Sequence, residues 1–179
     1  MNIDRFWEII ELSRRAVTPD RADGNMERQL QELDALLSNL SPDEIAAFDS
    51  QLVAHMKAAY RWDLWAAAYL IADGCSDDGF VDFRGWLISM GRDVFERAIA
   101  NAESLADVAD GPGIEDVFFE GFINVPDQVY ERLAGREIPE HKDHSLGEPA
   151  GHPWNSEGDD LQRRFPWLWA KYRGNKAHA

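Results

Sequence analysis

Residues 62–90 decide the fold, and they read WDLWAAAYLIADGCSDDGFVDFRGWLISM. The apolar run 62–72 is typical of a buried helix, and Gly74 ends it because glycine tolerates the left-handed conformation found just beyond helix ends. Helical spacing of apolar residues returns at Phe83, with Asp82 as the expected N-cap. The stretch therefore predicts two packed helices joined by an acidic turn.

The remaining helices are predicted from the same kinds of signal. Asn2 is expected to cap the first helix, and Ser41-Pro42-Asp43-Glu44 combines a capping serine, a proline at the first helical position and a glutamate that reaches back. Nothing predicts a sheet beyond an extended stretch near 122–125. The predicted fold is an all-α, single-domain orthogonal helical bundle. Other expected helical segments cover residues 26–40, 114–122 and 126–133, and Gly91 is an expected break.

Composition divides the chain into three parts. Residues 1–135 are predicted to form the helical core. Residues 136–158 are rich in Pro, Gly, His and charge, which predicts a long irregular loop on the surface. Residues 159–179 regain an apolar face, so a C-terminal helix is expected to dock on the core, with a break at Pro166 and a frayed end.

The chain has 179 residues and a formal net charge of −15. Such a surface repels phosphates, so no nucleic acid and no membrane is expected as a partner. A basic protein or a small ligand is expected instead, and no oligomeric state is predicted. The single Cys75 is typical of a reducing compartment, and Asp4 and Glu8 interrupt the apolar run that a signal peptide needs. A cytoplasmic location is predicted.

The segment DDGFVDF at 77–83 resembles the middle of an EF-hand loop. If Gly79 takes loop position six, positions one and twelve fall on Gly74 and Gly85, which carry no carboxylate. This register argues against an EF-hand, and no cofactor is predicted. Three carboxylates remain hypothetical ligands of a looser divalent-metal site: Asp73, Asp77 and Asp78.

The favoured interpretation of this loop is a tight turn. Asp77 or Asp78 would accept backbone N–H groups, and Gly79 would take a positive φ. The alternative is a hydrolase or lyase-like enzyme that uses Asp77 and Asp78 as acid and base or as metal ligands, with Arg84 binding an anionic group. Cys75 follows a helix C-terminus among carboxylates, so an inert, buried thiol with a raised pKa is expected.

Histidines and tryptophans give weaker signals. His141 and His144 have a spacing that suits zinc on a helix, but Pro139 and Pro149 flank them, which favours a solvated loop. Most tryptophans are expected in the core, although tryptophan beside carboxylates also lines clefts that hold cationic or ring-shaped ligands. Two groups stand out: Trp62, Trp65 and Trp86 near the acidic turn, and Trp154, Trp167 and Trp169 near the C-terminus.

The segments 62–72, 74–80 and 83–88, with the opening DRFWEII, resemble a bacterial family of uncharacterised proteins, the domain-of-unknown-function family 4240. The resemblance continues loosely to about Leu133 and is weak beyond. It implies a small, stand-alone intracellular domain and no established activity. Any shared site would fall on the signature positions. Two of these residues, Arg84 and Asp63, are equally consistent with a structural role as a buried ion pair. Those positions are Trp62, Asp63, Trp65, Cys75, Asp77, Asp78, Phe80, Arg84 and Trp86.

The leading functional hypothesis is an acidic, cytoplasmic binding module that recognises a protein or a small ligand. Toxin-inhibiting immunity proteins, which neutralise a basic partner, are one concrete form of it. The alternatives are the enzyme described above and a purely structural helical domain. The recognition groove is expected around residues 62–86, and its candidate ligand-binding residues are Trp62, Asp63, Trp65, Asp77, Asp78, Arg84 and Trp86.

Overall fold

The structure is a computed structural model that describes residues 1–139, 147–155 and 159–174. Every named element in these ranges is a helix, which confirms the all-α prediction. The elements are α1 (Ile3–Arg14), α2 (Asn25–Ser38), α3 (Pro42–Ala58), α4 (Trp62–Ile71), α5 (Asp77–Ser89), α6 (Arg92–Ala100), η1 (Ala102–Asp107), η2 (Phe122–Asn124), α7 (Val125–Ala134), α8 (Asp160–Arg164) and α9 (Pro166–Tyr172).

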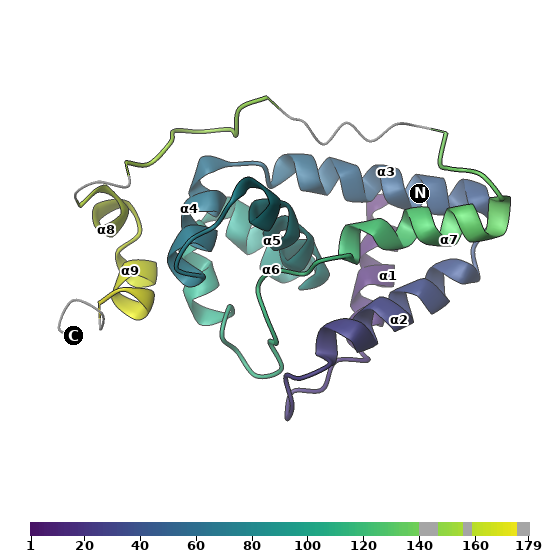
Figure 1. Ribbon diagram of the computed structural model, residues 1–179, viewed down its shortest axis with the longest axis horizontal. Coiled ribbons are helices and arrows are strands. Elements are labelled where there is room, and N and C mark those ends of the chain that lie inside the picture. The colour runs from purple at the N-terminus through teal and green to yellow at the C-terminus, as the bar shows by residue number, and fades with distance from the viewer. Residues whose placement is uncertain (140–146, 156–158, 175–179) are drawn as a thin grey trace.

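Two groups of helices form the body of the molecule. In the first, α2 packs on α1 and α7, and α7 packs along α3, while Figure 1 shows α1 passing behind α7. In the second, α5 contacts α4 and α6, and it also contacts α3 of the first group. The helix α9 lies against α4 and η1. The central position of α5 explains why its second half, residues 83–89, is entirely buried.

Local capping signals place the first and third helices where the sequence predicts them. The Asn2 side chain accepts the Arg5 N–H at 2.8 Å. At the start of α3, the Ser41 hydroxyl accepts the Glu44 N–H while the Glu44 carboxylate accepts the Ser41 N–H at 2.9 Å. Each such cap contributes about 1 kcal/mol to the free energy of unfolding, because it satisfies N–H groups that a helix start leaves free.

The core is centred on α5. Every residue from Phe83 to Ser89 is buried, and aromatic rings run along the helix from Phe80 to Phe83 to Trp86, with centroid distances of 6.2 and 5.3 Å. Burial of each such side chain contributes about 1.5–3 kcal/mol. A Cβ on Gly85 would lie 3.2 Å from the Ile123 side chain, so the segment before α7 approaches this helix closely.

The predicted helix over 114–122 and the extended stretch near 122–125 are both wrong. Residues 114–121 are irregular, and the short 3₁₀ turn η2 follows them. The irregular segment lies across α5, where the Phe119 N–H donates to the Asp82 carbonyl at 3.2 Å. This contact with a neighbouring helix replaces the bond to the fourth preceding residue that a helix would make.

The predicted C-terminal helix is interrupted at Pro166, as the sequence indicates. It consists of α8 and α9, and α9 docks on the body through buried Phe165 and Leu168. The end expected to fray covers residues 174–179, and all of these except Gly174 lie outside the described residues.

Part of the predicted surface loop over 136–158 is tied to the body. The Ala150 N–H donates to the Tyr60 carbonyl at 2.9 Å, and the Trp62 N–H donates to the Ala150 carbonyl at 3.0 Å. These two hydrogen bonds hold the segment around Ala150 against the start of α4. Within the described ranges, no helix is long and apolar enough to cross a membrane.

Candidate functional site

The turn between α4 and α5 is built differently from its prediction. Asp73 and Gly74 carry it, with φ angles of 61° and 136°. Ser76 then caps α5, since its hydroxyl accepts the Gly79 N–H at 3.1 Å. The predicted cap at Asp82 and the predicted positive φ of Gly79 are therefore wrong, because both residues lie within the helix.

The two adjacent aspartates, Asp77 and Asp78, occupy the first turn of α5 and are exposed. Ser76 makes the capping hydrogen bond that was expected of them, and their charges favour the positive end of the helix dipole. The third hypothetical metal ligand, Asp73, pairs with the Arg173 guanidinium. Across the described ranges, no group of three or more His, Cys, Asp or Glu side chains is placed to hold a metal ion.

Asp82 is the carboxylate of this region with a perturbed acidity. Its side chain is partly buried one turn into α5, and the loss of hydration raises its pKa above the ordinary value. The nearby charges of Glu120 and Asp78 raise the pKa further. Asp82 therefore holds a proton more tightly than an aspartate in water.

Cys75 behaves as the sequence predicts in its acidity, although it is half-buried rather than fully buried. Burial raises the pKa of its thiol to about 12, and the charges of Asp77 and Asp82 add to the rise. The indole N–H of Trp65 donates to the Cys75 carbonyl at 3.1 Å, which fixes the turn against α4. A thiol in this state is a poor nucleophile, since the thiolate is the reactive form.

The tryptophans of the predicted groove are partly covered by the chain itself. Trp62 and Trp65 stack with a centroid distance of 5.4 Å and an interplanar angle of 9°. Trp154, from the C-terminal segment, meets both rings edge-on at 5.5 and 6.2 Å. The two tryptophan groups seen in the sequence thus join through this residue, and its ring occupies space that a ligand would need.

Arg84 and Asp63 do not form the predicted buried ion pair. Asp63 pairs with Arg61 at 2.9 Å. Arg84 is 2% exposed, and its guanidinium donates to the carbonyls of Met56 at 2.9 Å and Phe80 at 3.2 Å. Burial lowers its pKa to about 10. The cation thus satisfies one of the carbonyls that the end of α3 leaves free, which joins α5 to α3.

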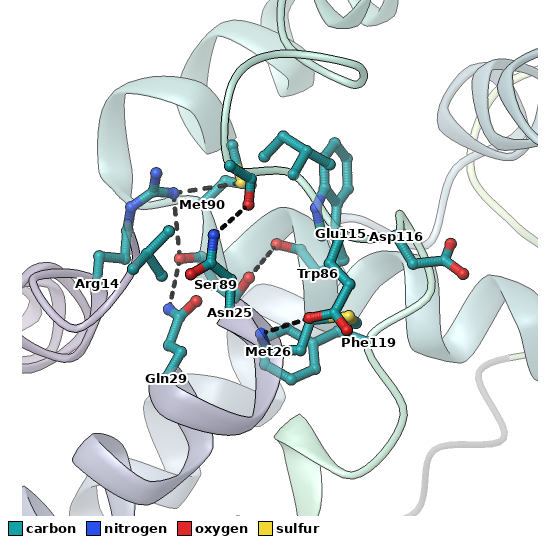
Figure 2. A pocket seen from close by; sticks show the side chains of 13 residues that line it. Arg14, Asn25, Met26, Gln29, Trp86, Ser89, Met90, Glu115, Asp116 and Phe119 are labelled. Carbon is teal, nitrogen blue, oxygen red and sulfur yellow. Dashed lines mark hydrogen bonds between the residues drawn. The ribbon is translucent and has the colours of Figure 1, made fainter. Parts of the chain in front are cut away.

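Trp86 lies apart from the other candidate residues and lines a small cavity of about 30 Å³ (Figure 2). The walls come from α1, α2, α5 and the irregular segment around residues 113–119. Arg14 and Gln29 lie on one side of the cavity in Figure 2, and Glu115 and Asp116 lie on the other. Sequence reasoning missed this site because its residues are far apart along the chain and share no motif.

An acidic groove of about 460 Å³ lies between α1 and α6. Trp7 lines it, is 3% exposed, and has an indole N–H with no hydrogen-bond partner among the described residues. Among the described residues, the lining has one guanidinium, that of Arg92. The carboxylates of the lining are Asp4, Glu8, Glu11, Asp93 and Glu96.

A signal for this acidic groove was present in the sequence. Asp4, Glu8 and Glu11 recur at steps of four and three, so they lie on one face of α1. These three carboxylates lie next to the acidic start of α6 only because segments that are distant in the sequence pack together. The two histidines considered as zinc ligands, His141 and His144, lie outside the described residues.

Fold and sites together define a small, strongly acidic, all-α protein with a buried aromatic core. The chain belongs to the family described as protein of unknown function (DUF4240), which matches residues 1–132. This confirms the resemblance seen in the sequence, and the match ends within α7, before the C-terminal segment. Comparisons with curated proteins and with solved structures find no match.

Proposed function

We propose that the protein is a binding module whose acidic groove between α1 and α6 receives a basic segment of a partner protein. One observation carries the proposal: in the part of the chain that the structure describes, five carboxylates and a single guanidinium line one groove, and the net charge of the chain is −15. A surface of this kind attracts Lys and Arg side chains over a distance and speeds their encounter. A cytoplasmic, bacterial setting belongs to the same proposal.

The groove carboxylates have partners that a ligand can exchange. Arg92 pairs with Asp4 at 2.9 Å and with Glu96 at 2.6 Å, while Glu8 pairs with Arg5 at 2.7 Å. These pairs are exposed and screened by solvent, so each contributes little to stability. A basic peptide that brings several cations at once can therefore replace them at little cost.

The test is binding of a fluorescent Lys- and Arg-rich peptide, with an acidic peptide of equal length as the control. We expect the affinity for the basic peptide to fall as salt is raised, and to fall in Glu8→Gln/Glu96→Gln. The matched variant Asp77→Asn/Asp78→Asn removes the same charge at the acidic turn. A loss confined to the second variant would move recognition to residues 62–86, and an equal loss in both would show attraction to the net charge alone. Binding that neither salt nor either variant alters would refute the proposal.

A second candidate, a hydrolase or lyase-like enzyme that uses Asp77 and Asp78, has one observation in its favour. The pKa of the neighbouring Asp82 is raised by burial and by Glu120 and Asp78, as is typical of a carboxyl group that donates a proton. A carbon-13 NMR titration of Asp82 tests it. If this carboxyl titrates in the ordinary range of aspartate, the chemical argument for an enzyme fails.

A further inference from the structure

The cavity beside Trp86 contains a cation that lacks a matching anion. One guanidinium nitrogen of Arg14 donates to the Ser89 carbonyl at 3.3 Å, which is long for an oxygen acceptor, and to the Met90 sulfur at 3.3 Å (Figure 2). No carboxylate of the described residues lies within 4 Å of Arg14, although the chain carries 33 acidic side chains. Glu11, one turn earlier on the same helix, attracts Arg14 electrostatically, but its carboxylate accepts the Arg92 N–H.

Trp86 offers a second donor to the same cavity. Its side chain is 2% exposed, and it lines the cavity together with Arg14. In Figure 2 the indole lies across the cavity from Arg14. A partly buried guanidinium without an ion-pair partner costs free energy. An oxyanion between the two groups would offset this cost and could also accept the indole N–H.

Other polar groups of the lining are already in use. The Asn25 amide donates to three backbone carbonyls, with distances of 2.8 to 2.9 Å, and Gln29 donates to the Ser89 carbonyl at 2.9 Å. Glu115 accepts the Met26 N–H at 2.9 Å. Arg14 and Trp86 are therefore the donors that a ligand would meet.

The mouth of the cavity differs in charge from its interior. Glu115 and Asp116 line the cavity and are exposed, so they mark the side that opens to solvent. The Asp116 carboxylate accepts the next two backbone N–H groups through one oxygen only. A ligand with an anionic group inside the cavity and a cationic group at the mouth would complement the charges at both ends.

We propose that this cavity binds a small amino-acid-like zwitterion, with the carboxylate held by Arg14 and Trp86 and the ammonium group beside Glu115 and Asp116. The volume of about 30 Å³ accommodates a carboxylate group and excludes a ring or a long chain. The carboxylate and the ammonium group of such a ligand are separated by a single carbon, which suits a short path from interior to mouth. This site is independent of the acidic groove and of its proposed partner.

The test is an NMR titration of the full chain that follows the indole N–H resonance of Trp86, assigned with Trp86→Phe. The probes are glycine, acetate, which lacks the ammonium group, and glycinamide, which lacks the carboxylate. We expect glycine to shift the resonance, acetate to bind more weakly, and glycinamide to have no effect. Acetate that binds as tightly as glycine would overturn the zwitterion assignment.

Two matched variants separate a binding role from a structural one. Arg14→Gln should weaken glycine binding by at least about tenfold, because hydrogen bonds to a charged group are lost. Arg15→Gln removes the same charge from the exposed neighbouring residue and should leave the affinity unchanged. Glu115→Gln keeps an acceptor for the Met26 N–H and should bring glycine to the affinity of acetate. If glycine does not bind, or binds equally to Arg14→Gln, the proposal is wrong.

Discussion

The two ends of α5 are both turns that contain glycine, yet their surroundings differ. Before the helix, a Cβ on Gly74 would have nothing within 4 Å, and the aspartates that follow face solvent. After the helix, Gly91 is buried, adopts φ 90° and ψ 170°, and leaves room for a side chain of α1 only because it has no Cβ. That side chain is Glu11, which accepts the Arg92 N–H at 3.1 Å.

The difference teaches where structural constraint lies in this molecule. The turn between α4 and α5 is easy to recognise in the sequence because its polar residues cap a helix and face water. The turn at Gly91 stands out little, yet it holds α1, α5 and α6 together through one carboxylate. A run of acidic residues is thus a weaker sign of structural constraint than a glycine that a side chain from another helix contacts.

The largest expected effect is that of Gly91→Ala. The φ and ψ of this residue lie in a region that is essentially reserved for glycine, and a methyl group would displace the Glu11 carboxylate from the Arg92 N–H. We expect a loss of about 3 kcal/mol in the free energy of unfolding, measured by urea denaturation. Gly74→Ala, with a positive φ in open space, should lose less. Equal losses would break the comparison.

The next effect concerns the reactivity of Cys75. Because burial raises its pKa to about 12, little thiolate is present near neutral pH. We expect alkylation by iodoacetamide at mildly alkaline pH to be at least about a hundredfold slower in the folded protein than in urea. Mass spectrometry measures both rates. Asp77→Asn, which removes one charge that raises this pKa, should give a small acceleration, and similar rates in both states would contradict the inert turn.

A smaller effect is expected for Ser76→Ala, which removes the cap of α5. The lost hydrogen bond to the Gly79 N–H should cost about 1 kcal/mol in the free energy of unfolding. Ser76→Asp keeps an acceptor at the cap position and should retain most of the stability. If Ser76→Ala has no effect, another acceptor caps the helix. The exposed turn then contributes even less to the free energy of unfolding than we infer.

The smallest effect is expected for Asp77→Asn combined with Asp78→Asn. Both side chains are exposed, so stability should change by only about 0.5 kcal/mol per residue, through the helix dipole. Thermal shift with calcium, magnesium, manganese and zinc should give equal responses in the variant and the unmodified protein. A metal that stabilises only the unmodified protein would make this turn a metal site and strengthen the enzyme alternative.

Local signals predicted the parts of the fold that depend on neighbouring residues. The caps at Asn2 and Ser41 and the break at Gly91 were correct, because each depends on atoms within one turn of helix. The start of α5 was misplaced because Ser76 and Asp82 are both good capping residues, and only the packing of the first turn decides between them. The candidate site was predicted less accurately than the fold, since its residues take their partners from other helices.

By itself, the sequence determined the all-α class, most helix positions, the acidic charge and the family. Tertiary structure alone decided that Arg84 bonds to carbonyls rather than to Asp63, and that Trp154 covers Trp62. It also decided that Arg14 shares a cavity with Trp86 and Glu115. The physical reason is range: capping and periodicity act within a turn or two of helix, whereas burial and charge pairing depend on segments that only folding brings together.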